Sequence, residues 1–433
     1  MMWRAQKCAG RPTTGPRSMF MHKFWSQLLA VSVFSVSSVS LVSAQAHVES
    51  GVDRLSSAFP KVLEGKRVGL ITNHTGHDRH RTPTIDLLAG RKDMKLVALY
   101  APEHGIRGVA TGRIEFEKDE KTGLPVHSLF GATQKPTPAM LDSVDALVFD
   151  IQDVGVRQYT YISTLGLAMQ AAAEKKIPIV VLDRPNPIGG TIIEGNIRED
   201  GLESFVGLYP IASRYGMTPG ELAGMYNKFW KIGADLHVVK LAGWKRDLWL
   251  DKTDLPWTGP SPNLPVFEGI IHYPGTVFFE GTNVSEGRGS EAPFELIGAP
   301  YIHAKALADS MTALKLPGVR FVSQTYPIRA TGRKYGGQTI HGVRLHVTDR
   351  ETYRPIATSM RLMAMIRKLH PTEFQWRSSR RGADSVETFS LDRLTGSKRI
   401  RAAIEGGTLN ALLAEWDRDA EKFREQRKPY LLY

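Results

Sequence analysis

Four short apolar runs in the first half of the chain, with helical segments between them, constrain the fold more than any other feature. The runs cover residues 65–73, 96–100, 142–150 and 177–182. Between them, residues 84–89 form a helix candidate and residues 165–176 place apolar side chains at helical spacing. Strand and helix that alternate at this pitch indicate a parallel sheet with right-handed crossovers. The sequence therefore predicts an α/β domain with a Rossmann-like, mostly parallel sheet.

Polar side chains gather just after each of these runs. They are Asn73 and His74; Glu103 and His104; Asp150, Gln152, Asp153 and Arg157; and Asp183, Arg184 and Asn186. The carboxyl ends of parallel strands meet at one edge of a sheet, and open α/β sheets bind their ligands in the crevice beyond that edge. Any one of these residues can instead be an ordinary cap or turn residue. Because polar residues follow all four predicted strands in the same way, we predict that they line one shared cleft.

Residues 95–108, KLVALYAPEHGIRG, place a carboxyl group and an imidazole where a buried strand ends. Pro102 has no N–H with which to continue a ladder of hydrogen bonds, and Gly105 and Gly108 allow the backbone to turn sharply. The alternative is a capping glutamate followed by a loop histidine. We interpret the stretch as a strand that leads into an active-site loop carrying Glu103 and His104.

Residues 276–289, TVFFEGTNVSEGRG, repeat this pattern in the second half of the chain. A short apolar strand is predicted at the start, and the loop after it carries Glu280, Asn283, Glu286 and Arg288. The glycines of this loop let backbone amides approach a ligand closely. A flexible solvated turn is the alternative, but the likeness to the Glu103 loop favours a site.

The Pro- and Gly-rich residues 256–265 are predicted to be irregular and to separate two domains, residues 47–265 and 266–433. Just before them, Thr218 and Glu221 are spaced as the two halves of a capping box at the start of a helix over residues 218–230, which explains Glu221 without a catalytic role. The remaining chain alternates helix candidates at 304–314, 353–369, 398–406 and 409–427 with strands at 319–326 and 339–347. This order predicts a smaller α+β domain after the first.

The N-terminus has the pattern of a secretory signal peptide. Lys23 provides a basic start, residues 28–42 are apolar, and small residues offer cleavage sites after Ala44 or Ala46. We therefore assign residues 1–46 to a signal peptide and leader, and we expect the mature protein to be periplasmic or secreted. The single cysteine, Cys8, lies in this leader, so the mature chain is predicted to lack disulfides, thiolate metal ligands and a thiol nucleophile.

Several classes of protein are excluded by missing motifs. No Gly-x-Gly-x-x-Gly follows the first strand, and no P-loop, Gly-x-Ser-x-Gly or His-Glu-x-x-His occurs. The formal net charge is +12, but five basic residues of that excess lie in the leader and no dense basic run remains. We therefore predict no nucleotide cofactor, no metal, no nucleic-acid partner, and no stable membrane insertion once the signal peptide is removed.

Five segments taken together resemble one known family. They are PEHGIRG at 102–108, FDIQDVGVR at 149–157 with YTY at 159–161, LDRPNP at 182–187, EG at 194–195, and EGTNVSEGRG at 280–289. The chain resembles the NamZ-type exo-β-N-acetylmuramidases, which form glycoside hydrolase family 171 and were formerly catalogued as a domain of unknown function, DUF1343. The resemblance implies a Rossmann-like domain, a smaller second domain and an active cleft between them. The activity it implies is release of N-acetylmuramic acid (MurNAc) from the non-reducing ends of peptidoglycan fragments, and Glu103 matches the proposed catalytic glutamate.

Glycoside hydrolysis needs an acid for the leaving oxygen and a second group opposite the anomeric carbon. We predict Glu103 as the acid, with a pKa raised by packing behind Tyr100 and Pro102, and His104 as its positioning or proton-relay partner. The second carboxylate stays open among Glu286, Glu280, Asp153 and Glu194. Glu286 ranks first because adjacent glycines leave its loop free to close. The 2-acetamido group of the substrate is a further alternative for the nucleophile.

The predicted substrate-binding set contains the polar residues of all these segments. It comprises Asn73, Asp150, Gln152, Asp153, Arg157, Arg184, Asn186, Glu194, Glu280, Asn283 and Arg288. Among them Arg157, Arg184 and Arg288 are candidates for the lactyl carboxylate of a muramic sugar, because a guanidinium binds a carboxylate through two parallel hydrogen bonds. The competing interpretations are an exported sugar- or muropeptide-binding protein without turnover, and a hydrolase of another class, which should show a metal triad or a nucleophile motif.

Overall fold

The computed structural model describes residues 45–107, 117–380 and 387–433. The predicted signal peptide lies outside these residues except for Gln45 and Ala46, and so does Gly108 of the predicted active-site loop. Within the described ranges no helix is long and apolar enough to cross a membrane.

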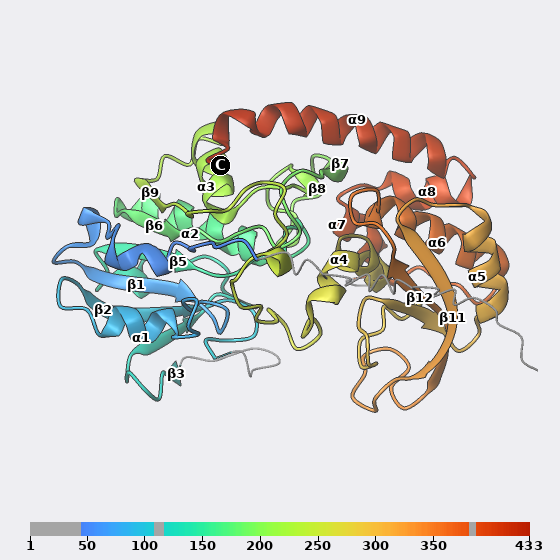
Figure 1. Ribbon diagram of the computed structural model, residues 1–433, viewed down its shortest axis with the longest axis horizontal. Coiled ribbons are helices and arrows are strands. Elements are labelled where there is room, and N and C mark those ends of the chain that lie inside the picture. The colour runs from blue at the N-terminus through green and yellow to red at the C-terminus, as the bar shows by residue number, and fades with distance from the viewer. Residues whose placement is uncertain (1–44, 108–116, 381–386) are drawn as a thin grey trace, which may run out of the picture. The chain divides into compact units, whose positions relative to one another are not determined.

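A seven-stranded sheet organises the first part of the chain, and it confirms the predicted Rossmann-like, mostly parallel sheet (Figure 1). Its strand order is β3-β4-β2-β1-β5-β6-β9, and every neighbouring pair is parallel except β3 and β4. The strands are β1 (Arg67–Thr72), β2 (Lys95–Ala101), β3 (Glu117–Lys118), β4 (Pro125–Ser128), β5 (Ala146–Asp150), β6 (Ile179–Leu182) and β9 (Leu236–Val239). The chain extends the sheet in one direction from β1 to β2 and β4, then returns to place β5 on the other side of β1. This reversal is the switch point at which open α/β sheets form their ligand crevice.

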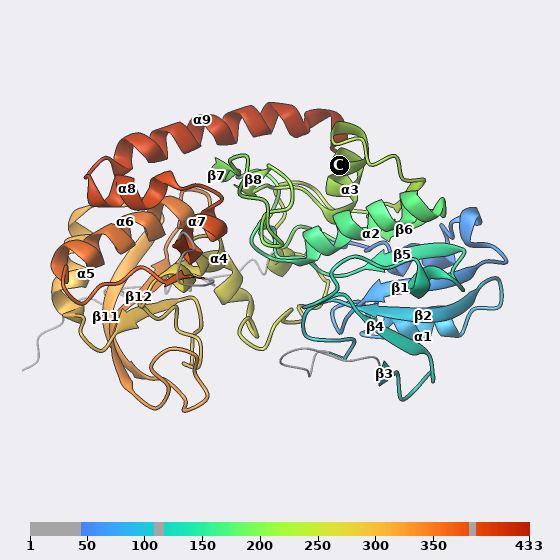
Figure 2. The same cartoon turned by 180° about the vertical axis from the view of Figure 1, so that it is seen from behind.

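Both faces of this sheet are covered by other parts of the chain. Alternate residues of the central strands point to opposite faces and belong to two separate apolar clusters. One face, with Leu70 and Val148, packs against residues 52–63 and α1 (Thr84–Ala89). The opposite face, with Ile71 and Phe149, packs against α2 (Tyr161–Lys175) and α3 (Pro219–Phe229). Figure 1 shows the sheet from the α1 side and Figure 2 from the α2 side. Strands buried on both faces become continuous apolar runs in sequence, which is why they could be recognised there.

The helix boundaries follow local signals. Thr218 accepts a hydrogen bond from the Glu221 N–H at 3.2 Å and the Glu221 carboxylate accepts one from the Thr218 N–H at 3.0 Å, so the predicted capping box of α3 is confirmed. Before β1, the chain forms two short 3₁₀ turns, η1 (Asp53–Ser56) and η2 (Lys61–Leu63). Two further 3₁₀ turns, η3 (Ala139–Leu141) and η4 (Leu250–Lys252), and the antiparallel pair β7 (Glu194–Ile197) and β8 (Ala212–Arg214) were not predicted.

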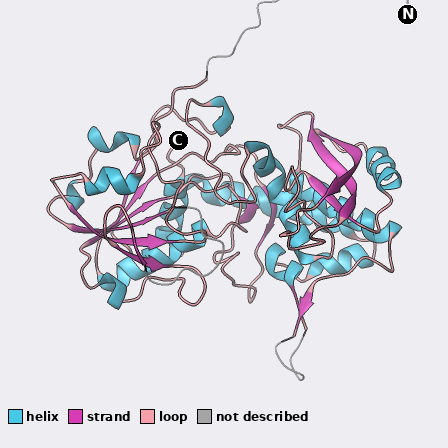
Figure 3. Cartoon of the chain, turned by 90° about the horizontal axis from the view of Figure 1, so that it is seen from below, coloured by secondary structure: helices cyan, strands magenta, loops and turns pink. Residues whose placement is uncertain are grey.

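A smaller domain with antiparallel sheets follows, which confirms the predicted fold class. Its main sheet has the order β10-β12-β11, with β10 (Leu296–Ala299), β11 (Val319–Pro327) and β12 (Thr339–Val347), and a second pair joins β13 (Ser378–Ser379) to β14 (Thr388–Phe389). Its helices are α4 (Phe267–Thr276), α5 (Ala304–Ala313), α6 (Pro355–Leu369), α7 (Ser390–Thr395), α8 (Arg399–Glu405) and α9 (Leu409–Arg427). Figure 3 shows the two groups of strands apart from each other, each flanked by helices.

One predicted strand of this domain is wrong. The apolar residues near 276–279 are instead the end of α4 and the 3₁₀ helix η5 (Val277–Gly281). Val277, Phe278 and Phe279 are buried, so their apolar character reflects burial and not an extended backbone. A short buried run gives the same sequence pattern whether it is strand or helix.

The C-terminal segment returns to the first domain. Helix α9 contacts α8, α6 and β7, and η6 (Lys428–Tyr430) after it contacts α3 (Figure 1). The Tyr433 hydroxyl donates to the Asp183 carboxylate at 2.7 Å and accepts from the Leu241 N–H at 2.8 Å. The last residues of the chain therefore anchor the smaller domain to the parallel sheet.

Candidate active site

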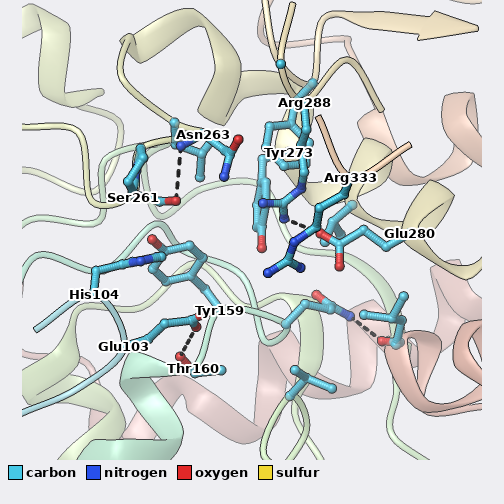
Figure 4. Close-up of a pocket in the computed structure, with 18 of the residues that line it drawn as sticks. Glu103, His104, Tyr159, Thr160, Ser261, Asn263, Tyr273, Glu280, Arg288 and Arg333 are labelled. Carbon is cyan, nitrogen blue, oxygen red and sulfur yellow. Dashed lines mark hydrogen bonds and ion pairs between the residues drawn. The ribbon is translucent and has the colours of Figure 1, made fainter. Parts of the chain in front are cut away.

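A cavity of about 820 Å³ is lined by residues from both domains. The first domain contributes Glu103, His104 and residues 158–160, and residues 261–264 contribute from the irregular Pro- and Gly-rich segment. The smaller domain contributes Tyr273 of α4, Val277 and Glu280 of η5, and the loop residues Arg288, Gly289, Arg329, Thr331, Gly332 and Arg333. The two loops that the sequence singled out, after residues 102 and 279, therefore meet in one cavity (Figure 4).

The loop after β2 turns sharply to present Glu103. Pro102 ends the strand, and the Gly105 N–H donates to the Pro102 carbonyl at 3.2 Å. His104 and Gly105 both have a φ of 75°. Glycine adopts this left-handed backbone conformation without steric strain, whereas the Cβ of histidine makes it strained. Residues in such strained conformations concentrate at functional sites, where contacts with the surrounding structure hold them in place.

The Glu103 carboxyl group is half-buried, and Thr160 donates a long hydrogen bond of 3.4 Å to it. Burial raises the pKa of Glu103, and the negative charge of Glu280 adds to the rise, while Arg288, Thr160 and Arg333 oppose it. Burial is the largest of these influences because it removes water from the charged form. The structure thus provides a carboxylic acid that keeps its proton to a higher pH than an exposed glutamate.

Aromatic rings form a continuous wall of the cavity. Tyr159 meets Tyr273 edge to face at a centroid distance of 5.7 Å, and Tyr273 meets Phe294 in the same way at 4.8 Å. The guanidinium of Arg288 lies 5.0 Å from the centroid of Phe294. Tyr159 belongs to the first domain and the other rings to the second, so this wall also joins the two domains.

The loop at 280–289 carries a chain of ion pairs. Arg288 pairs with Glu280, and its Nε lies 3.1 Å from an Oε of Glu286. The other Oε of Glu286 accepts from the Lys334 ammonium at 2.8 Å. Although burial opposes ionisation of Glu286, the nearby charges of Lys334 and Arg288 hold its pKa below the usual value. Glu280 and Arg288 face the cavity, whereas Glu286 lies behind them and is 3% exposed.

Comparison with known proteins assigns the chain to a family. The model described as exo-beta-N-acetylmuramidase NamZ, N-terminal, matches residues 68–268, and the corresponding C-terminal model matches residues 271–433. The chain belongs to the NamZ family. It is 47% identical over 389 residues to the peptidoglycan beta-N-acetylmuramidase NamZ of Bacillus subtilis (strain 168), a match that covers 89% of this chain and 91% of the relative.

Two crystal structures of DUF1343 family proteins from Bacteroides fragilis NCTC 9343 are also similar. The first has a TM-score of 0.81 and 39% identity and covers 90% of this chain and 100% of its own. The second has a TM-score of 0.70 and 32% identity, with 90% and 99% covered. The NamZ family suggested by the sequence motifs is therefore confirmed.

Four of the predicted site residues line the cavity of this NamZ family member: Glu103, His104, Glu280 and Arg288. Glu286, which ranked first as the second carboxylate, does not, because its carboxylate is turned toward Lys334 and the far side of Arg288. Among the described residues, no three His, Cys, Asp or Glu side chains are grouped to hold a metal ion.

The other predicted substrate-binding residues do not line the cavity, because their side chains are held by internal hydrogen bonds. They are Asn73, Asp150, Gln152, Asp153, Arg157, Arg184, Asn186, Glu194 and Asn283. Arg157, for example, is 1% exposed and donates to the backbone carbonyls of Ile211 and Thr395, each at 2.6 Å. Asp153 accepts from the Gly155 N–H and the Tyr215 hydroxyl, and burial raises its pKa to about 7. These groups support the loops around the cavity and do not line it.

Sequence reasoning missed other cavity residues. Tyr159 and Thr160 lay inside a quoted family motif, but neither was proposed for the site. Residues 261–264 were assigned only to a domain boundary, and Arg333 lies in the β11–β12 connection, where nothing in the spacing marks it. The signal that could have found the first two was their position directly after the polar cluster at 150–157.

The position of Glu286 predicts a supporting role. Glu286→Gln is expected to lower kcat/KM by about 10- to 100-fold, because loosening Arg288 and Lys334 misplaces the groups that face the substrate. Loss of the second catalytic carboxylate itself would cost more, about 10³-fold or above. We expect Glu286→Gln and Lys334→Gln to be strongly non-additive in kcat/KM, since each removes the same contact. Additive losses in the double variant would contradict this role.

Proposed function

We propose that this protein is an exo-acting glycoside hydrolase that releases MurNAc from the non-reducing ends of peptidoglycan fragments. The observation that carries the proposal is the half-buried Glu103 carboxyl group in a sugar-sized cavity that also exposes the Glu280 carboxylate. The NamZ family and the peptidoglycan beta-N-acetylmuramidase of Bacillus subtilis supply the substrate class.

In the proposed mechanism Glu103 is the general acid. Its proton goes to the glycosidic oxygen as the bond to the anomeric carbon breaks, so that the leaving sugar departs as a neutral alcohol. Because burial raises the pKa of Glu103, its acid form persists to a higher pH than that of an exposed glutamate. His104, next to it in a left-handed backbone conformation, holds the turn that aims the carboxyl group.

Glu280 is the proposed second carboxylate, in place of Glu286. It reaches the cavity from the smaller domain, on a different side from Glu103 (Figure 4). A carboxylate in this position stabilises the positive charge that develops on the sugar. It can do so as a nucleophile, as a base for water, or by orienting the 2-acetamido group of the substrate. The aromatic wall around Tyr273 gives the sugar an apolar face to pack against.

The electrostatics of the two carboxyl groups predict a shift in pH dependence. A general acid must be protonated, so kcat/KM is expected to fall as the pH rises through the pKa of Glu103. Glu280 raises that pKa, and Glu280→Gln also frees the positive charge of Arg288, which lowers it. Both effects act in the same direction, so the alkaline limb of Glu280→Gln should lie at lower pH than that of the wild type. A limb that stays in place or moves to higher pH would contradict this electrostatic coupling.

We also propose that the protein is exported and that residues 1–44 are its signal peptide. Of the two predicted cleavage points, the one after Ala44 fits better, because the Ala46 N–H donates to the Lys252 carbonyl at 2.8 Å and the Ala46 carbonyl accepts from the Asp254 N–H at 3.0 Å. N-terminal sequencing of the exported protein tests this proposal. A first residue at or beyond His47 would contradict it.

Release of p-nitrophenol from its β-N-acetylmuramide and β-N-acetylglucosaminide tests the activity. We expect cleavage of the muramide only, together with release of MurNAc from the MurNAc-GlcNAc disaccharide. Tight binding of MurNAc without turnover would instead support an exported binding protein. Proton NMR of the first anomer released then assigns the stereochemistry, and with it the role of Glu280.

A further inference from the structure

Four arginines line the cavity, and they differ in what already binds them: Arg288, Arg329, Arg333 and Arg393. Arg288 is paired with Glu280 and Glu286. The Nε of Arg329 donates to the Gly289 carbonyl at 3.3 Å. For Arg333 and Arg393, no ion pair or hydrogen bond of the guanidinium is found with the part of the chain that the structure describes. These two cations are therefore the ones available to an anionic ligand.

The backbone that presents Arg333 is tied down. Its neighbour Lys334 donates to the carbonyls of Phe279 and Val284 at 2.8 and 2.7 Å and to Glu286 at 2.8 Å. The β11–β12 connection is also held at Arg329, whose N–H donates to the Gly289 carbonyl at 2.9 Å. Side chains on anchored segments keep their direction better than side chains on free loops. Figure 4 shows the Arg333 guanidinium directed into the cavity, between Glu103 and Glu280.

Arg333 lies in the same cavity as the proposed acid, and its positive charge acts on that acid (Figure 4). Arg288 and Arg333 are the arginines of this cavity whose positive charge lowers the pKa of Glu103. Arg288 is largely neutralised by its two carboxylate partners, whereas Arg333 is not. Arg333 lines the same cavity as Glu103 and is directed toward it in Figure 4, so an uncompensated cation faces the proposed acid.

The structure of a muramic sugar requires its carboxylate to lie near the catalytic acid, as Arg333 lies near Glu103. Its lactyl ether is attached to C3 of the same ring whose C1 is the reacting carbon. The carboxylate that distinguishes MurNAc from N-acetylglucosamine must therefore lie within one sugar ring of the acid that cleaves the bond. An arginine near Glu103 and without a carboxylate partner meets this requirement, and a planar guanidinium binds a carboxylate through two hydrogen bonds.

We propose that Arg333 binds the lactyl carboxylate and thereby sets the preference for MurNAc over N-acetylglucosamine. The inference rests on the proposed function and deepens it, because it replaces Arg157, Arg184 and Arg288 as candidates for this contact. Arg157 and Arg184 are committed to buried partners, and Arg288 is committed to Glu280 and Glu286.

Substrate binding at Arg333 also affects Glu103. The groups that act on its carboxyl are Arg288, Arg333 and Glu280 from the smaller domain and Thr160 from the first. The neutral hydroxyls of Tyr159, Tyr161 and Tyr273 lie around them. A bound lactyl carboxylate compensates the charge of Arg333, which is one of the influences that favour ionised Glu103. The acid then keeps its proton to higher pH in the complex than in the free enzyme. With the muramide, the alkaline limb of kcat should therefore lie above that of kcat/KM, and the two limbs should converge in Arg333→Gln.

The decisive experiment compares p-nitrophenyl β-N-acetylmuramide with the β-N-acetylglucosaminide. Arg333→Gln is expected to lower kcat/KM for the muramide by about 100-fold, as loss of a charged bidentate contact does, and to change any slow cleavage of the glucosaminide far less. Arg333→Lys should retain part of the preference. Arg320→Gln, an exposed arginine on β11 away from the cavity, is the matched control and should behave as the wild type.

Calorimetry with MurNAc and N-acetylglucosamine in the Glu103→Gln background measures recognition without turnover. We expect Arg333→Gln to remove the tighter binding of MurNAc. If the wild type cleaves neither glycoside, the proposed function fails, and this binding measurement still tests Arg333. Unchanged discrimination in Arg333→Gln, or its loss in Arg393→Gln instead, would overturn the inference.

Discussion

Glu103→Gln is expected to lower kcat/KM for the MurNAc-GlcNAc disaccharide by about 10³- to 10⁴-fold, which is the upper range for loss of a general acid. The amide keeps the size of the side chain and can still meet the Thr160 hydroxyl, but it has no proton to transfer. Because Glu103 is half-buried and forms no ion pair with the residues that the structure describes, the replacement should leave the thermal unfolding midpoint nearly unchanged.

Substrates with different leaving groups show whether Glu103 donates a proton or only binds the sugar. A sugar hydroxyl needs a proton to depart, whereas p-nitrophenol leaves as a stable phenolate. The loss in Glu103→Gln should therefore be at least about tenfold smaller for p-nitrophenyl β-N-acetylmuramide than for the disaccharide. Glu64→Gln, an exposed glutamate, is the control and should match the wild type on both substrates. Equal losses on the two substrates would show that Glu103 holds the sugar and that another group donates the proton.

The parallel sheet was predictable because its strands are buried on both faces and read as continuous apolar runs. The loop at Glu103 was predictable for a related reason, since Pro102 and Gly105 mark the point where such a run must end. The apolar residues after α4 misled the prediction, because burial alone makes a 3₁₀ helix resemble a short strand. The local sequence pattern shows which residues are buried more reliably than it shows whether the backbone is a strand or a helix.

The site was less predictable than the fold, because its members are separated by long stretches of chain. Sequence position could not show that Arg184 faces Asp150 rather than a ligand, or that Glu286 turns toward Lys334. Nor could it show that Arg333, on a hairpin connection with no motif, reaches the cavity of Glu103. Each of these depends on which loops meet in three dimensions, and a strand-end position is equally suitable for a buried salt bridge and a binding group.

The Asp150–Arg184 pair provides the largest expected effect on stability. The Arg184 Nε lies 2.5 Å and one Nη 2.9 Å from the two carboxylate oxygens, and the side chains are 6% and 0% exposed. The same Nη donates to the His77 carbonyl at 2.8 Å, and Thr84 donates to Asp150. This network joins the ends of β5 and β6 to the loop after β1, at the switch point of the sheet.

Arg184→Met is expected to lower the free energy of unfolding by about 3–5 kcal/mol, because it leaves the Asp150 carboxylate buried without its cation. Arg399→Met, which breaks an exposed pair with Glu415, should cost about 1 kcal/mol or less and serves as the control. Urea unfolding monitored by fluorescence gives both values, with an unchanged m-value as the sign that the unfolded state is the same. If Arg184 instead bound substrate, its loss would raise KM and leave stability nearly intact. A buried structural pair predicts the reverse: the protein that remains folded binds MurNAc normally, and Asp150→Asn added to Arg184→Met recovers part of the stability by removing the stranded charge.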